Sequence, residues 1–149
     1  MDRIDQKILR HLQGDARASL QDISKAVGLS PSPCWERIRK MEAAGVIEGY
    51  TVRINPQAIG LNETVLVQVT LDSHSENTLE RFGETLAAIP EVIECFLVSG
   101  EYDYLLRIAV RDTRDYERLL REKLYKIKGI RHSKSNFVLR TLKKADLPV

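Results

Sequence analysis

The stretch Gly28–Lys40, GLSPSPCWERIRK, places two prolines directly before its most basic short cluster. Proline is disfavoured inside a helix, but it is tolerated in the first turn, where the N–H groups have no intrahelical partner. We therefore read Ser30 as the N-cap and Pro31 as the first helical residue, and we expect the Ser30 side chain to cap the N–H of Ser32. On this interpretation the prolines fix where a helix begins.

Two shorter helical patterns precede this helix. Apolar residues recur at helical spacing in residues 4–12 and again in residues 20–27. Ser19 and Asp22 have the spacing of a loose capping box, and Gly28 stands where the end of a helix favours a left-handed residue. A short helix, a tight turn with glycine and a further helix together predict a helix-turn-helix.

The third helix is expected over residues 31–44, with Cys34, Ile38 and Met41 facing the other two helices. Charged residues on a helix are usually only its solvated side. Here they follow a helix-turn-helix spacing and precede an alternating segment, 46–54, that predicts the small β-hairpin of a wing. We therefore expect contact with DNA from the following residues: Ser30, Ser32, Trp35, Glu36, Arg37, Arg39 and Lys40.

The chain changes character after a segment rich in Pro, Gly and Asn, residues 55–63, which we interpret as a linker. Periodicity then predicts strands and helices in the order β-α-β-β-α-β, over residues 64–71, 77–89, 92–98, 104–110, 113–127 and 131–142. This order is typical of a ferredoxin-like domain. The sequence thus predicts an α+β protein with a winged helix-turn-helix domain (1–54), a ferredoxin-like domain (64–142) and a tail (143–149).

Several of the predicted strands are apolar on both sides, although the two helices of the second domain can cover only one face of the sheet. An uncovered apolar face implies a partner, and the simplest partner is a second copy of the chain. Two-fold symmetry also suits a helix-turn-helix, because it places two recognition helices in successive major grooves about 34 Å apart. We therefore expect a homodimer.

Composition narrows the class of protein further. The chain has 149 residues and a formal net charge of +2; residues 1–54 carry 9 Lys and Arg against 7 Asp and Glu, so the basic excess lies in this first part. The two cysteines form no CxxC pair, no apolar run reaches the roughly 20 residues of a membrane span, and the charged N-terminal segment is unlike a signal peptide. The expectation is a cytoplasmic protein without contact with a membrane.

Catalytic chemistry finds little support in the sequence. The three histidines, His11, His74 and His132, are scattered, and no HExxH, nucleophile elbow, P-loop or GxGxxG is present. Glu101 and Asp103 could form an acid–base pair or a metal site at a turn, but a turn with two solvated carboxylates is the simpler interpretation. We expect no enzyme, no metal and no cofactor.

Taken together, these motifs resemble the Lrp/AsnC family of transcription regulators. The resemblance covers essentially the whole chain and rests on DRIDQKIL, GLSPSPCWERIRKMEAAGVIEGY, the NP of the linker, VSGEYDYLL and KGIRHSKSNFVL, with the leucine-responsive branch as the nearest pattern. It implies a winged DNA-binding domain and a second domain that dimerises, assembles dimers into higher oligomers, commonly octamers, and binds an amino acid.

The same resemblance places the effector at the turn VSGEYDY. Local features alone favour a simple hairpin turn, in which Gly100 supplies conformational freedom and Asp103 is a common turn residue. Yet bare backbone at Gly100 also lets a small ligand approach, and Asp103 could accept hydrogen bonds from an ammonium group. With the last strand as a helper, the resemblance implies these effector residues: Val98, Gly100, Tyr102, Asp103, Tyr104, Ser133, Ser135 and Asn136.

The function that the sequence predicts is a DNA-binding transcription regulator whose DNA binding or assembly responds to an amino acid. Polar residues on the last strand favour a small neutral amino acid. Two alternatives stay open at this point. One is an architectural DNA-wrapping protein with no small effector, and the other is an amino-acid-binding module that retains only a vestigial DNA-binding domain.

Overall fold

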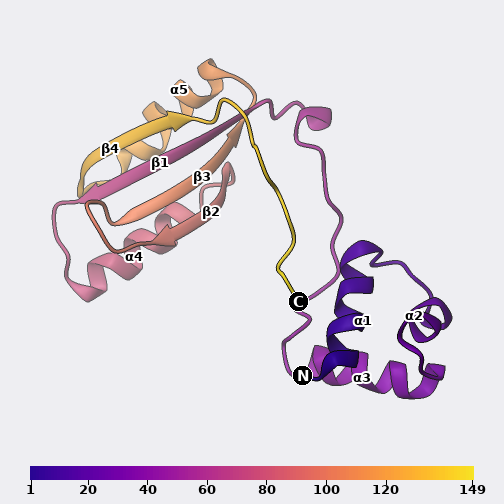
Figure 1. Cartoon of the computed structure of the whole chain (residues 1–149). Helices are drawn as coiled ribbons and strands as arrows, with labels where there is room; N and C mark the ends of the chain where they lie inside the picture. Colours follow the sequence, from indigo (N-terminus) through magenta and orange to yellow (C-terminus); the bar gives the residue numbers. More distant parts are fainter. The chain divides into compact units, whose positions relative to one another are not determined.

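The computed structural model describes the main chain of residues 1–149 and every side chain except that of Glu76. The chain divides into two compact units (Figure 1). The first unit combines residues Met1–Arg53 with the tail Lys143–Val149, and the second consists of Ile54–Leu142. The tail therefore belongs to the unit with which the chain begins, although it follows the second unit in sequence.

The first unit contains three helices, α1 (Arg3–Gly14), α2 (Leu20–Val27) and α3 (Pro31–Ala43). Gly28 ends α2 in the left-handed conformation, with φ of 74°, which glycine adopts without a steric penalty. The core consists of side chains from all three helices: Ile8, Leu9, Ile23, Val27, Cys34 and Met41, with Ile38 packed against them. The helix-turn-helix and the inward side of the third helix are therefore confirmed.

The start of α3 differs from expectation in one detail. Pro31 is the first helical residue and Ser30 the N-cap, as predicted, but the Ser30 side chain makes no capping hydrogen bond. The comparison with α2 gives the reason. There the N-cap Ser19 accepts a hydrogen bond from the N–H of Asp22, the third helical residue, whereas the third helical residue of α3 is Pro33, which has no N–H.

The β-hairpin predicted for the wing is not present. Residues 46–54, all described by the structure, contain no strand. Ile47 packs against the core of the three helices, but the later apolar side chains are exposed, with Val52 76% and Ile54 59% accessible. An isolated two-stranded hairpin is marginal in water without a third strand or a packed face, and each arm here would have only a few residues beside Gly49. The alternation of apolar residues over this segment was therefore too short to predict a hairpin correctly.

The second unit has the predicted β-α-β-β-α-β order. Its elements are β1 (Glu63–Leu71), α4 (Glu76–Ala87), β2 (Val92–Leu97), β3 (Tyr104–Val110), α5 (Thr113–Glu122) and β4 (Ile130–Phe137), with short 3-10 turns η1 (Gln57–Ile59) and η2 (Leu124–Lys126). The four strands form one sheet in the order β2-β3-β1-β4, and all neighbours are antiparallel (Figure 1). The predicted α+β class is confirmed.

Both helices of this unit cover the same face of the sheet. The core joins side chains from both helices to the inward row of β1, which is fully buried, and to β3: Val65, Val67, Val69, Leu71, Leu86, Ile89, Tyr104, Leu106, Ile108, Val110, Tyr116, Leu119 and Leu124. The opposite face carries Leu66, Leu105 and Phe96, because their cross-strand partners alternate with those of the core residues. Phe96 is 47% exposed.

The largest boundary errors in this unit are at the ends of the last helix and the last strand, which were predicted to extend further. The last strand ends at Phe137 rather than at residue 142, because its partner β1 begins at Glu63 and the register pairs Val65 with Phe137. The last helix ends at Glu122 and continues as η2. A tighter 3-10 turn is common at a helix end, and it leaves room for the left-handed turn at Gly129, with φ of 99°, before β4.

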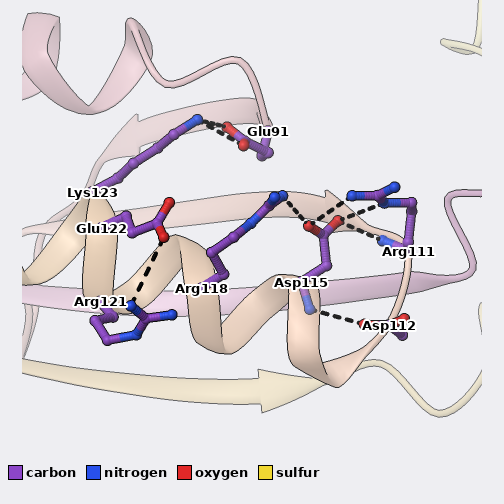
Figure 2. A network of polar contacts seen from close by, with 8 residues as sticks. All are labelled: Glu91, Arg111, Asp112, Asp115, Arg118, Arg121, Glu122 and Lys123. Atoms are coloured by element: carbon purple, nitrogen blue, oxygen red, sulfur yellow. Dashed lines mark hydrogen bonds and ion pairs between the residues drawn. The ribbon is translucent and has the colours of Figure 1, made fainter.

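A polar network fixes the two ends of α5 (Figure 2). At its start Asp112 caps the helix by accepting the N–H of Asp115 over 2.8 Å, and the Asp115 carboxylate pairs with Arg111 and Arg118. Near its end the Lys123 ammonium donates to both carboxylate oxygens of Glu91 over 2.7 Å. Arg118 in the helix and Arg111 just before it are thus both paired with Asp115, and exposed pairs of this kind contribute only about 0–1 kcal/mol each.

Candidate functional site

The outer side of α3 forms one continuous polar face. Ser32, Trp35, Glu36, Arg39 and Lys40 are all exposed, and residues three and four apart are neighbours on a helix surface. Ser30, just before the helix, is exposed as well. Six of the seven residues predicted to contact DNA therefore share an accessible surface, on the side of the helix opposite the buried Cys34 and Met41.

Trp35 and Arg39 form a pair at the centre of this face. The Trp35 side chain is 53% exposed, and the guanidinium carbon of Arg39 lies 5.6 Å from the centre of its ring. Such cation–π contacts orient a guanidinium without neutralising it. A loose ion pair with Glu42, 3.7 Å away, leaves the Arg39 side chain 65% exposed. Arg39 is therefore held in place but remains available to a partner.

Arg37, the seventh predicted DNA contact, lies elsewhere. Its Nη1 donates to Asp2 Oδ2 over 2.7 Å and to Asp5 Oδ1 over 2.8 Å, so it joins α3 to the start of α1. The same two aspartates form a capping box, in which each side chain accepts the main-chain N–H of the other. Arg37 is thus committed to holding two helices together.

These contacts shift the acidity of the aspartates. The hydrogen bond from the Asp5 N–H, followed by that from Arg37, lowers the pKa of Asp2 from 3.8 to about 2. The pKa of Asp5 is lowered chiefly by the N–H of Asp2. The two carboxylates in turn raise the pKa of Arg37, with Asp5 as the larger cause. All three groups are therefore charged at neutral pH, where their ion pairs can form.

The turn VSGEYDY joins β2 to β3 and is tied firmly to the sheet. The N–H of Asp103 donates to the Val69 carbonyl, and the Asp103 carbonyl accepts the N–H of Val98, each over 2.9 Å. The Asp103 side chain accepts the N–H of Leu71 over 2.7 Å, and its other oxygen lies 3.0 Å from His74 Nε2. The Asp103 side chain is therefore engaged with β1 and with His74, and it keeps 16% exposure.

Tyr104 and Gly100 have different surroundings. Tyr104 is 3% exposed and lies in the core, with its hydroxyl donating to the Leu79 carbonyl. Gly100 has φ of 130°, a conformation that favours glycine, and nothing lies within 4 Å of the position that a Cβ would occupy. The main chain at Gly100 is thus open to approach from outside, which Tyr104 is not.

The three predicted helper residues of β4 do not share one face. Ser133 and Ser135 pair with Val69 and Val67 and so lie on the helix-covered side, whereas Asn136 pairs with Leu66 on the opposite side. The Ser135 hydroxyl is hydrogen-bonded to that of Tyr116. Ser133 is close to the turn in the sheet, because Val69 pairs with both Ser133 and Tyr104.

Ser133 and Tyr104 nevertheless border different hollows. The hollow beside Tyr104, of about 440 Å³, is lined by Leu79, Gly83 and Cys95 among others. The hollow beside Ser133, of about 300 Å³, includes Tyr125 and the β4 residue His132 among its lining. One protomer therefore brings the turn and Ser133 to the same end of the sheet without enclosing them in one pocket.

Sequence reasoning missed three side chains that matter at these sites. Asp2 and Asp5 have the spacing of a capping box, a signal that was present in the sequence. The approach of His74 to Asp103 had no local signal, because it depends on the course of the chain after β1. Among the described residues, no group of three or more His, Cys, Asp or Glu side chains could hold a metal ion.

Both units of the chain are similar to known protein families. Residues 1–48 match the family model for winged helix-turn-helix DNA-binding domains, and residues 64–148 match that of the Lrp/AsnC ligand binding domain. The second match spans more than half of the chain. The chain belongs to the Lrp/AsnC family of transcription regulators.

Individual members of the family are similar over nearly the full length. The leucine-responsive regulatory protein of Escherichia coli K12 is 40% identical over 146 residues, which cover 98% of this chain and 89% of the relative. The crystal structure of an AsnC family transcriptional regulator from Agrobacterium tumefaciens is 42% identical, with a TM-score of 0.94 and coverage of 99% and 97%. A Neisseria meningitidis transcriptional regulator in complex with L-methionine is 31% identical, with a TM-score of 0.90 and coverage of 97% and 93%.

This Lrp/AsnC protein is therefore a DNA-binding transcription regulator that responds to an effector. Its first unit carries the winged helix-turn-helix and its second the ligand-binding domain. The similar proteins named above are regulatory proteins, and two of them are named as regulators of transcription. In the described part of the chain, no helix is both long and apolar enough to cross a membrane.

Proposed function

We propose that the outer face of α3 reads operator DNA, with Arg39 as its principal base-reading side chain. The observation that carries this is the contrast between two arginines of one helix. Arg39 lies over Trp35 and is 65% exposed, whereas Arg37 is paired with Asp2 and Asp5. A guanidinium that is oriented by an aromatic ring and remains largely exposed suits bidentate contact with guanine in the major groove.

The remaining residues of this face have supporting roles. Lys40 adds a phosphate contact, Trp35 packs against a sugar or a thymine methyl group, and Glu36 discriminates against bases that present only acceptors. Ser30 and Ser32 contact the DNA backbone at the start of the helix, where the two prolines remove main-chain donors. Arg37 positions α3 on α1.

The effector is a small neutral amino acid that binds at the turn 98–104. The Neisseria meningitidis neighbour in complex with L-methionine supports an amino acid as the ligand class. The Asp103 oxygen that faces the exposed His74 accepts a hydrogen bond from the ammonium group of the amino acid. The open main chain at Gly100 binds the carboxylate of the amino acid. Val98 and Tyr102 border the ligand, Tyr104 supports the site from the core, and Ser135 supports it through its hydrogen bond to Tyr116. Ser133 and Asn136 contribute from β4.

A second copy of the chain completes this site. Because Tyr104 and Ser133 border separate hollows and Asn136 lies on the other face of the sheet, a single protomer supplies only part of the ligand's surroundings. The open sheet face, with Leu66, Leu105 and Phe96, is the dimer interface, and dimers assemble further, to an octamer. The protein acts where its DNA partner is, in the cytoplasm.

A thermal-shift screen of the twenty amino acids, followed by DNA-binding titrations, tests this proposal. A ligand that binds only the folded state raises its stability by mass action. One amino acid should shift unfolding of the wild-type chain and change its DNA affinity or oligomer size, and Asp103→Ala should abolish the shift. The alternative, an architectural DNA-wrapping protein, predicts broad DNA binding and no response to any of the twenty. An amino-acid-binding module predicts the shift without DNA binding.

A further inference from the structure

The wing segment that follows α3, residues 46–53, contains no strands that could pair with each other and hold it. Its near end is fixed to the helix, because the N–H groups of Val46 and Ile47 both donate to the Met41 carbonyl, over 2.9 and 3.2 Å. Further on, the Tyr50 hydroxyl donates to Glu42 over 3.0 Å. Its far end, at Arg53, depends on a different part of the chain.

Arg53 is paired with Asp146 of the C-terminal tail. The tail in turn is docked on α1. Gln13 Nε2 donates to the main-chain oxygen of Leu147 over 3.0 Å, and Arg10 Nε donates to that of Val149 over 2.5 Å. The Val149 side chain is partly buried against the core of the three helices.

These contacts form a bridge inside the first unit. One side of the tail engages α1 through two main-chain acceptors and an apolar side chain, and Asp146 reaches the end of the wing segment. The two anchoring donors on α1, Arg10 and Gln13, lie three residues apart and so share one face of the helix. An extended tail can follow that face and present alternate groups to α1 and to Arg53.

We propose that the tail, residues 143–149, is a brace that holds the wing segment for DNA binding, in place of the missing hairpin strand. This rests on the DNA-binding role of the first unit and adds a second element to it. A flexible wing would lose conformational freedom on contact with DNA, whereas a braced wing has already lost it, so docking of the tail strengthens DNA binding. The C-terminal end of the chain thereby contributes to DNA binding from within the first unit.

The test uses the full-length chain and two readouts, amide hydrogen exchange in residues 46–53 and affinity for operator DNA. Asp146→Arg opposes Arg53 with a like charge and should speed exchange in the wing segment by about two- to fivefold, the range for an exposed ion pair. Val149→Asp and removal of residues 143–149 also detach the tail from α1, and each should speed exchange and weaken DNA binding by about tenfold.

Two controls make the result specific. Lys144→Ala changes a tail residue that makes none of the described bridging contacts, and it should leave exchange in the wing segment unchanged. The double variant Arg53→Asp with Asp146→Arg restores the opposite charges, so it should return exchange to the wild-type rate.

Unchanged exchange in residues 46–53 after tail removal would overturn the brace, and so would faster exchange with wild-type DNA affinity. If the double variant failed to restore slow exchange, the Arg53–Asp146 ion pair would not be part of the brace. Arg39→Ala should weaken DNA binding without altering exchange, which keeps a failure of the proposed recognition face distinct from a failure of the brace.

Discussion

The two units of the chain are stabilised in different ways. Among the described side chains, the ligand-binding unit has thirteen buried residues in one core between a four-stranded sheet and two helices, whereas the core of the DNA-binding unit has six. A small domain gains less from burial, and here it adds short polar contacts: a capping box at Asp2, the pairing of Arg37 and the docked tail. The difference indicates that polar substitutions will matter most in the first unit and packing substitutions in the second.

The largest expected effect is on the core of the second unit. Leu106 is fully buried at the centre of the sheet, and Leu106→Ala should lower the free energy of unfolding of that unit by about 2–5 kcal/mol through lost burial and a cavity. Ile8→Ala makes the matched change in the smaller core. Chemical denaturation followed by amide exchange should show each variant destabilising mainly its own unit. Equal loss in both units from either variant would mean that they unfold as one.

One glycine in each unit allows the same comparison, with smaller expected losses of stability. Gly129 in the second unit has φ of 99°, and a Cβ there would lie 2.6 Å from Phe82 Cζ; Gly28 in the first has φ of 74° and open space around it. Gly129→Ala should cost about 2–4 kcal/mol from strain plus overpacking, and Gly28→Ala about 1–2 kcal/mol from strain alone. Thermal unfolding measures both. Adding Phe82→Leu to Gly129→Ala should recover part of the lost stability. If it recovered none, the clash with Phe82 would not be the cause of the loss.

The two arginines of α3 separate binding from stability within the first unit. Arg39→Ala should weaken specific DNA binding by about 1–3 kcal/mol if it reads guanine, with unfolding unchanged. Arg37→Ala should instead lower the unfolding temperature of the first unit, because Asp2 and Asp5 lose their partner. Fluorescence anisotropy and thermal unfolding provide the two readouts. A uniform loss of affinity with a salt slope lower by about one would reassign Arg39 to phosphate.

Most of the fold could be predicted from local signals in the sequence. The prolines at the start of α3, the left-handed Gly28 and the alternation in β1 each depend on a few neighbouring residues, and each was predicted correctly. The β-hairpin predicted for the wing is absent from residues 46–54, because alternation over nine residues does not guarantee a partner strand. The end of β4 failed because strand length is set by β1, which is distant in sequence.

The candidate sites show the same limit more strongly. That α3 has an outer side follows from helical periodicity alone. That Arg37 turns toward Asp2, 35 residues away, or that Ser135 bonds to Tyr116 from the covered face, depends on how separate elements pack. Which side chains are free to meet a ligand is therefore decided by tertiary structure, even where their positions in sequence suggest a motif.

The smallest expected effect is on the stability of the first unit at acidic pH. Contacts in the first unit lower the pKa of Asp2 to about 2 from 3.8, the Asp5 N–H being the main cause, and the pKa of Asp5 is lowered as well. A carboxyl whose pKa is depressed by folding adds stability that is present above its unfolded value and is lost as pH falls through the folded value. Unfolding of the first unit should therefore become easier between about pH 4 and pH 2. Asp2→Asn should flatten this part of the pH profile, and Arg37→Gln should flatten it less, because Arg37 is the second cause for Asp2. An unaltered profile in Asp2→Asn would show that other carboxylates control the response to acid.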